Sequence, residues 1–107
     1  MNVIFKDDAL LELYQNGETK NKNYKKYSRD REFTTSYKEI IDLFYSLENT
    51  SQLSSFSYLH YEKLRHRPES SVRIINSRVE RLLFTEEEEG ITVELIEIDD
   101  KHYGKKR

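Results

Sequence analysis

The sequence contains no cysteine, one proline and three glycines. The absence of cysteine excludes a disulfide scaffold, a thiol nucleophile and a cysteine-ligated zinc or iron–sulfur site. So little proline and glycine argues against a low-complexity or disordered chain. No apolar run approaches the roughly 20 residues that cross a bilayer, and residues 1–8 lack the apolar stretch of a signal peptide. We therefore expect a cytoplasmic protein that does not contact membranes.

Aromatic side chains offset a low content of apolar residues. Hydrophobic residues make up 36% of the 107 residues, and charged residues make up another 36%. Eight tyrosines and five phenylalanines are present, and a few such large side chains can fill the core of a small domain. The length fits one domain, so we expect a single unit over 1–107 without internal repeats.

The net charge of −2 conceals a strong segregation of charge along the chain. Residues 20–31 hold six basic side chains and one acidic one, and residues 63–81 hold six basic and two acidic. Residues 86–100 hold eight acidic side chains and no basic one. These segments could pair with one another on a solvated surface, or the basic ones could attract a polyanion. Charge alone favours the first interpretation.

The N-terminal residues predict a strand followed by a helix. Residues 2–5 are β-prone and are followed by two aspartates. Asp7 or Asp8 can cap a helix over 7–16 by accepting hydrogen bonds from its first turn. Gly17 can end that helix, because glycine readily adopts the left-handed conformation.

A second helix is predicted over 30–48, with Asp30 as its cap. The preceding residues 18–29 are polar and basic, which indicates a loop or a frayed helix start. In the helix, apolar residues recur at three- and four-residue steps and form one stripe. The stripe consists of Phe33, Tyr37, Ile40, Ile41, Phe44 and Leu47.

After Leu53 the apolar period changes from about 3.6 to about 2, which predicts β-strands. The expected strands cover 59–65, 71–75, 79–85 and 91–98. They are separated by a break at 66–69 that includes Pro68, by a turn at 76–77 and by an acidic turn at 86–90. The last strand is apolar on both sides near its end, so we expect it in the interior of the sheet.

Together these elements predict a two-layer α+β domain. The strands are joined by short turns, which make neighbours antiparallel because parallel neighbours need long crossovers. We expect strand, helix, helix and then an antiparallel meander of about four strands, with both helices covering one face of the sheet. The opposite face is then free to hold another molecule.

Four stretches of the chain, in this order, are similar to those of one protein family. They are Val3-Ile4-Phe5-Lys6-Asp7 with the following helix, Leu59-His60-Tyr61-Glu62-Lys63-Leu64-Arg65, Ser71-Val72-Arg73-Ile74 with Arg81-Leu82-Leu83-Phe84, and Ile96-Glu97-Ile98-Asp99-Asp100-Lys101-His102-Tyr103-Gly104. Over nearly its whole length the chain resembles the RelE/ParE superfamily of bacterial toxins, most of all the HigB-like branch of plasmid maintenance killer proteins. It departs from the family in being less basic and in having His66 where the family has glycine.

The resemblance implies the toxin of a type II toxin–antitoxin module that cuts messenger RNA inside the ribosome. In that reaction a 2′-OH attacks the adjacent phosphate, which needs a base, a cation and an acid but no metal or cofactor. His102 matches the closing histidine of the family, and Asp100 matches its closing aspartate. In an extended segment these side chains share a face, so Asp100 would orient His102. The alternative is a solvated histidine in the tail.

Four basic residues are candidates for the phosphate clamp that the resemblance implies. Arg73 and Arg81 match the hairpin arginines of the family, and two arginines on adjacent strands suit one phosphoryl group. Arg65 stands where the family has a lysine, and Lys63 lies two residues before it on the same expected strand face. The simpler interpretations are ion pairs with acidic residues of the last strand for the first pair, and a solvated edge strand for the second.

Other residues are expected to contact RNA. Tyr103 could stack on a nucleobase. Six basic residues would touch ribosomal RNA phosphates as a salt-sensitive footprint, namely Lys20, Lys22, Lys25, Lys26, Arg29 and Arg31. We expect His60 to be packed or hydrogen-bonded rather than a base. We expect residues 86–89 to form a solvated acidic loop rather than a metal site.

The expected partners are the ribosome with its mRNA and a helix-turn-helix antitoxin of the HigA-like kind. Two alternatives stay open. ParE-like toxins share the fold but lack the nuclease residues and act on gyrase, which Asp100 and His102 argue against. A toxin relic or a pure interaction module is suggested by the low basicity and the altered loop at 65–68.

Overall fold

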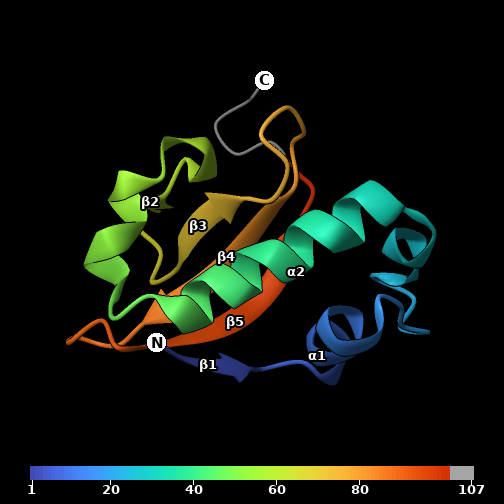
Figure 1. The fold of residues 1–107 in the computed structure, drawn as a ribbon, viewed down its shortest axis with the longest axis horizontal. Coiled ribbons are helices and arrows are strands. Elements are labelled where there is room, and N and C mark those ends of the chain that lie inside the picture. Colours follow the sequence, from blue (N-terminus) through green and yellow to red (C-terminus); the bar gives the residue numbers. More distant parts are fainter. Residues whose placement is uncertain (102–107) are drawn as a thin grey trace.

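The computed structural model describes residues 1–101 (Figure 1). This part of the chain forms strands, two α-helices and short 3₁₀ helices. In chain order the elements are β1 (Asn2–Phe5), α1 (Asp8–Asn16), η1 (Lys25–Arg29), α2 (Arg31–Ser46), η2 (Thr50–Ser55), η3 (Ser57–Leu59), β2 (Glu62–Lys63), β3 (Ser70–Arg73), β4 (Arg81–Glu86) and β5 (Thr92–Asp99). No helix within the described residues is long and apolar enough to cross a lipid bilayer.

The strands form one five-stranded sheet in the order β1-β5-β4-β3-β2. Strands β2 to β5 are antiparallel neighbours, which confirms the predicted meander. Strand β1 joins the sheet beside β5 and runs parallel to it. Strand β5 therefore has a partner on each side, as its apolar sequence predicts. The two-layer α+β fold is confirmed.

Both α-helices begin at an aspartate that caps the first turn, and α1 also ends at a glycine. The Asp7 side chain accepts a hydrogen bond from the Ala9 amide at 2.8 Å and starts α1. Gly17, with φ of 73°, ends it by donating its N–H to the Leu13 carbonyl at 3.0 Å. Asp30 caps α2 by accepting from the Phe33 amide at 3.1 Å. Helix α2 stops at residue 46, two residues earlier than expected.

Helix α2 lies diagonally across the sheet, as Figure 1 shows, and supplies much of the core. Its predicted stripe is buried over Phe33, Tyr37, Ile40, Ile41 and Phe44. Phe44 meets Phe84 of β4 edge to face, with ring centroids 5.3 Å apart. The Tyr37 hydroxyl donates to the Leu10 carbonyl at 2.9 Å and so ties α2 to α1.

The strand predicted over 59–65 is wrong. Leu59 is buried at the end of η3, and His60 takes a left-handed backbone with φ of 49° that turns the chain. Only Glu62 and Lys63 pair with β3, opposite Ser71 and Ser70, because the chain turns at His60 before them and β3 has no residue beyond Ser70 to pair after them. The alternating pattern therefore reflects separate packing contacts rather than one ladder.

The predicted basic loop at 18–29 contains more structure than expected. Residues 25–29 form η1, and two tyrosines on either side of its start are buried. The Tyr27 ring stacks on Phe33 of α2, with centroids 3.9 Å apart. The Tyr24 hydroxyl accepts from the Ile98 amide at 3.4 Å. Aromatic anchors thus hold a charged loop against the core.

A bulge in β5 explains why this strand is apolar on two sides. Leu83 of β4 faces Glu97, but Phe84 faces Leu95, so Ile96 has no register partner. An extra residue reverses the alternation of faces. Leu95 and Ile98 therefore both reach the same core, although they are three residues apart.

Gly90 closes the turn between β4 and β5 against η2. Its carbonyl accepts from the Thr50 amide at 2.8 Å, and its φ is 75°. A β-carbon at this position would lie 2.7 Å from Thr50 Oγ1. Glycine is therefore required here by both backbone conformation and space.

Arg78 joins the β3–β4 loop to the start of α2. Its Nη1 donates to Asp30 Oδ2 at 2.9 Å, and its Nη2 donates to Glu80 Oε2 at 3.0 Å. Its guanidinium carbon lies 5.6 Å from the centre of the Phe33 ring. One arginine thus links a sheet loop, a helix cap and a core aromatic residue.

We expect acid to weaken this junction. Partial burial raises the pKa of Asp30, but hydrogen bonds from the Phe33 amide and Arg78 outweigh it, so the pKa lies below its ordinary value. The resulting stabilisation is present above the ordinary aspartate pKa of about 4 and is lost as the pH falls through the lowered value. Asp30→Asn, which keeps a helix cap, should lower the free energy of unfolding by about 0.5–1 kcal/mol at neutral pH. Urea unfolding should show this difference vanish toward pH ~2; a constant difference would contradict it.

Candidate functional site

Three charged side chains lie in a row on the face of the sheet away from the helices. Arg73 of β3 is the register partner of Arg81 of β4, and Arg81 is the register partner of Asp99 of β5. The neighbouring residues Leu82 and Ile98 belong to the core beneath the helices, so the three charged residues face the other way. We call Arg73, Arg81 and Asp99 the charged row. The expectation that Arg73 and Arg81 lie side by side is confirmed.

The Arg73 side chain is held by the backbone of the β3–β4 loop. Its Nη1 donates to the carbonyl oxygens of Asn76, at 3.3 Å, and Arg78, at 2.8 Å. Its Nε is buried and has no hydrogen-bond partner within the described chain. Among residues 1–101 no carboxylate lies within ion-pair distance of this guanidinium. Arg73 is thus oriented by neutral acceptors and keeps its charge available for an anion.

Arg81 reaches toward the β2 edge of the sheet. Its Nη1 lies 3.7 Å from Glu62 Oε2, although β2 is two strands away from β4. Glu62 is the register partner of Ser71, so the Arg81 side chain reaches across β3 on the face that carries Ser71. This acidic neighbour comes from β2, whereas the sequence pointed to the last strand. Arg81 therefore inclines away from Asp99, its register partner.

Two oxygen atoms on the same face are buried without a hydrogen-bond partner. Asp99 is 8% exposed; its Oδ1 accepts from the Lys101 amide at 3.2 Å, but its Oδ2 has no partner in the described chain. Ser71 is 1% exposed, and its Oγ also lacks a partner there. Buried polar atoms are nearly always hydrogen-bonded. Together with Arg73 Nε, they are the buried side-chain polar atoms of the described residues that have no hydrogen-bond partner.

Asp100 lies apart from the charged row. Strand β5 ends at Asp99, and the Asp100 carboxylate pairs with Lys26 of η1, with 2.6 Å between Nζ and Oδ2. The hydrogen bond and charge of Lys26 lower the pKa of Asp100. The structure therefore does not bring Asp100 to the two arginines. His102 and Tyr103 lie outside the described residues, so their expected roles stay predictions.

Lys63 and Arg65 are also separated from the charged row. Lys63 is the register partner of Ser70, one residue before Ser71, so it lies on the helix side of the sheet. Burial raises the pKa of Glu86, but hydrogen bonds from Ser70 and Tyr61, together with the charge of Lys63, outweigh burial and lower this pKa. Arg65 is an exposed turn residue beyond the end of β2. The expectation of a shared strand face for Lys63 and Arg65 is wrong, because the strand ends between them.

His60 is linked to the charged row through Asn76. Its Nε2 lies 2.5 Å from Asn76 Oδ1, and the Asn76 backbone carbonyl accepts from Arg73. His60 is exposed, and its left-handed backbone is of a kind that clusters at functional sites. The sequence predicted a packed or hydrogen-bonded histidine here rather than a base, because its neighbours are apolar. Only the folding of the β3–β4 loop against η3 brings it near Arg73.

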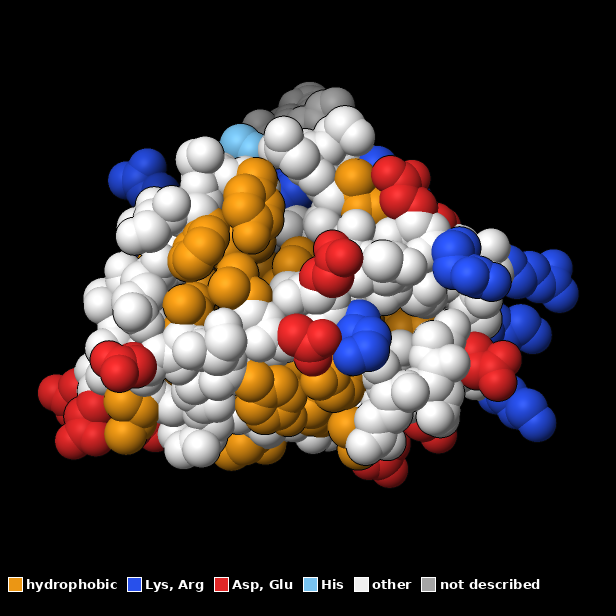
Figure 2. Space-filling model, viewed as in Figure 1, with side chains coloured by type: hydrophobic (Ala, Val, Ile, Leu, Met, Phe, Trp, Pro, Cys, Tyr) orange, Lys and Arg blue, Asp and Glu red, His pale blue; other side chains and the backbone are white. Residues whose placement is uncertain are grey.

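The basic residues of 20–31 gather at one end of the molecule, beside η1 and the start of α2 (Figure 2). Lys20, Lys25 and Arg29 line an open depression of about 630 Å³ between α1 and η1, together with Glu12 and Glu18. Arg29 and Arg31 line a second depression of about 550 Å³. We call Lys20, Lys25, Arg29 and Arg31 the basic groove. Lys22 is exposed beside it.

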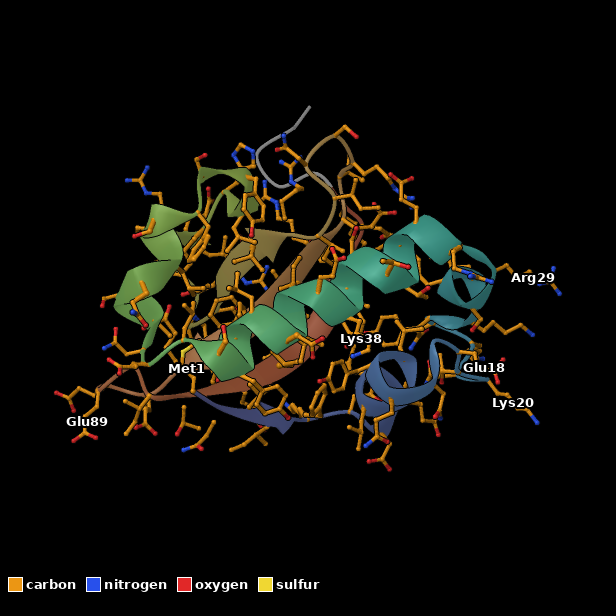
Figure 3. The ribbon with its side chains drawn as sticks, in the orientation of Figure 1. Met1, Glu18, Lys20, Arg29, Lys38 and Glu89 are labelled. Carbon is orange, nitrogen blue, oxygen red and sulfur yellow. The ribbon has the colours of Figure 1, made fainter. Side chains whose placement is uncertain are left out.

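Polar side chains fix the backbone that carries the basic groove. The Thr19 amide donates to Ser28 Oγ at 2.9 Å, and Ser28 Oγ donates to the Thr19 carbonyl at 3.1 Å. Thr19 Oγ1 donates to Glu12 Oε1 of α1 at 2.6 Å. Figure 3 shows Arg29 and Lys20 at this end of the molecule, while Glu89 of the acidic turn lies at the opposite end. This separation of charge favours the approach of a polyanion to the groove end.

We compared the chain with family models, with curated proteins and with solved structures, and none of the three comparisons found a match. The family resemblance therefore stays a hypothesis that rests on the motifs in the sequence. The geometry of the site has to carry the functional argument.

The acidic residues at the turn between β4 and β5 differ in their surroundings. Within residues 1–101 no three His, Asp or Glu side chains are gathered so that they could hold a metal ion. The Glu86 carboxylate accepts from the Tyr61 hydroxyl at 2.6 Å and from Ser70 Oγ at 2.5 Å, so it faces the protein. Residues 87–89 are exposed, as expected of a solvated loop. That the reaction needs no cofactor stays a prediction.

Proposed function

We propose that the chain is the toxin of a type II toxin–antitoxin module and that it cuts mRNA on the ribosome through the 2′-OH, without a metal. The observation that carries this proposal is the charged row, where Arg73 and Arg81 lie opposite each other on the sheet face away from the helices. Two guanidinium groups suit a phosphoryl group that gains charge in its transition state. The protein would act in the cytoplasm, where the ribosomes are.

Two further observations support the proposal. The element order is that implied by the resemblance: a strand, two helices and an antiparallel meander. His66 has a φ of 63°, the left-handed region that glycine favours, and the family has glycine at this place. A backbone conformation that favours glycine at this position supports the proposal, although the residue here is histidine.

The residues would divide the chemistry as follows. Arg73 and Arg81 would clamp the phosphate, and His102 would transfer the proton. Asp100, paired with Lys26, would hold the end of β5 that leads to His102. Lys63 and Arg65, at the β2 edge, would contact RNA outside the reacting phosphate. His60 is a second histidine that the link through Asn76 adds to this group.

Cleavage on the ribosome is the direct test of this proposal. Purified chain is added to ribosomes that carry a defined mRNA, and the new RNA ends are mapped. We expect cuts at the ribosome-bound codon that carry a 2′,3′-cyclic phosphate, because the 2′-OH is the nucleophile. Intact mRNA at all chain concentrations would overturn the proposal.

A non-catalytic module of the same fold is the alternative, and the contact of Arg81 with Glu62 favours it. An arginine committed to a carboxylate has less charge to offer to a phosphate. Such a module could poison gyrase, as ParE-like toxins do, or only bind a partner. Inhibition of gyrase supercoiling without mRNA cleavage would establish the first of these functions.

The basic groove is expected to provide salt-sensitive binding to ribosomal RNA. The double change Lys25→Gln and Arg29→Gln removes two cations from one fixed loop. It should weaken ribosome binding and reduce the slope of log affinity against log salt by roughly 1.4–1.8, since each phosphate contact contributes about 0.7–0.9. Filter binding across a salt series measures both effects. Lys38→Gln, which removes an exposed lysine paired with Asp42 on α2, should leave the slope unchanged.

An antitoxin should bind the chain tightly and cover basic surface. The basic groove offers an acidic segment of a HigA-like helix-turn-helix partner a complementary surface. Expression of the chain from its native operon, followed by pull-down and mass spectrometry, should recover such a partner. The groove variant Lys25→Gln/Arg29→Gln should recover less of it. A stable, harmless chain recovered alone would contradict this prediction.

A further inference from the structure

The carboxylate of Asp99 has no role in a phosphate clamp. A carboxylate repels a phosphate, yet Asp99 lies in register beside Arg81 and on the same face as Arg73. Its Oδ2 is buried without a partner, because Arg81 inclines toward Glu62 instead. A buried, unpaired carboxylate oxygen costs stability unless a ligand supplies a hydrogen-bond donor. A molecule that fits this site would place a negatively charged group at the arginines and a hydrogen-bond donor at Asp99.

A ribonucleotide satisfies both requirements with neighbouring groups. Its 3′-phosphate can meet the arginines, and its 2′-hydroxyl, on the adjacent carbon, is a hydrogen-bond donor. Asp99 and Arg73 stand two strands apart, which is roughly 9–10 Å between backbones, close enough for one ligand to touch both side chains. A deoxyribonucleotide offers the same phosphate but leaves Asp99 Oδ2 without a donor. The 2′-hydroxyl is the group by which proteins distinguish RNA from DNA.

We propose that Asp99 selects RNA over DNA at this site by accepting a hydrogen bond from the ribose 2′-hydroxyl next to the phosphate held by Arg73 and Arg81. This inference rests on the proposed function, because it assumes that the charged row binds a phosphate of a polynucleotide. The inference adds to the proposed function a residue, Asp99, that recognises the sugar of the nucleotide. Asp100, the next residue, is excluded from this role by its pair with Lys26.

The test compares uridine 3′-monophosphate with its 2′-deoxy analogue. Each is titrated into ¹⁵N-labelled protein, and the arginine Nε–H signals and backbone amides are followed by NMR. We expect the ribonucleotide to bind about 10-fold tighter or more, the effect of one hydrogen bond to a charged acceptor. The wild-type comparison needs no variant, so it stands even if a substitution disturbs the fold.

Asp99→Ala and the matched control Asp42→Ala, which removes an exposed carboxylate from α2, assign the preference to Asp99. Asp99→Ala should lower the preference to less than about 2-fold while phosphate binding remains, because the donor loses its acceptor. Asp42→Ala should keep the preference. Asp99→Ala removes an unsatisfied buried carboxylate, so its thermal unfolding midpoint should not fall.

The outcomes separate this inference from the proposed function. Equal binding of both nucleotides, with shifts of the arginine signals, would refute the role of Asp99 and leave the phosphate clamp in place. A preference that survives Asp99→Ala would do the same. Arginine signals that neither nucleotide shifts would overturn both the role of Asp99 and the clamp itself.

Discussion

Replacing His102 by alanine is expected to slow mRNA cleavage on ribosomes by about 10²–10⁴-fold, the usual contribution of one proton-transfer group. Histidine is the side chain whose unperturbed pKa lies nearest neutrality, so it can exchange a proton without help from burial. The measurement is single-turnover cleavage at saturating ribosome concentration, which separates chemistry from binding. Ribosome binding should be unchanged, because we assign it to the basic groove.

Arg73→Ala provides a second change in the same assay. It removes the guanidinium that only neutral carbonyls hold, so cleavage should slow while ribosome binding stays. Lys38→Ala is the matched control, since Lys38 is an exposed lysine of α2 that pairs with Asp42, and it should have a much smaller effect. Cleavage by His102→Ala at the parental rate would show that the tail histidine is not the catalyst. His60, next to Asn76, would then be the residue to replace.

Tyr37→Ala is expected to lower the free energy of unfolding by about 3–5 kcal/mol, the usual cost of removing a buried aromatic ring. Tyr37 is fully buried, and its hydroxyl bonds to the Leu10 carbonyl. Tyr37→Phe keeps the ring and loses that hydrogen bond, so it should cost about 1 kcal/mol. Tyr45→Ala, on the same helix but 46% exposed, is the control and should cost clearly less than Tyr37→Ala. Urea unfolding with all three variants measures these costs; equal effects of Tyr37→Ala and Tyr45→Ala would contradict the buried role of Tyr37.

The helical half of the chain was predictable because its signals are local. The stripe on α2 repeats at helical spacing, and Asp30 and Gly17 cap helices through side chains and backbone within a few residues. The antiparallel meander was predictable for a similar reason, since short turns leave no other way to pair its strands. Each of these features depends on contacts close in the sequence.

Most of the candidate site could not be predicted because it depends on contacts distant in sequence. The pairing of Arg73 with Arg81 could be expected from the hairpin, but Asp99 joins them only through the register of β5 after its bulge. His60 approaches Arg73 only through a contact 16 residues away along the chain. The expected partner of His102, Asp100, bonds instead to a lysine 74 residues earlier.

The parallel pairing of β1 with β5 determines how late in synthesis the sheet can be completed. Strand β1 is made first, but its partner residues in the sheet begin at Thr92, opposite Asn2. The sheet therefore cannot be completed until residues 92–99 have left the ribosomal exit tunnel, and contacts so distant in sequence form slowly. Asp99 completes the charged row at the end of this same strand. A chain built in this way therefore has no complete charged row until residues 92–99 have been made and have emerged from the ribosome.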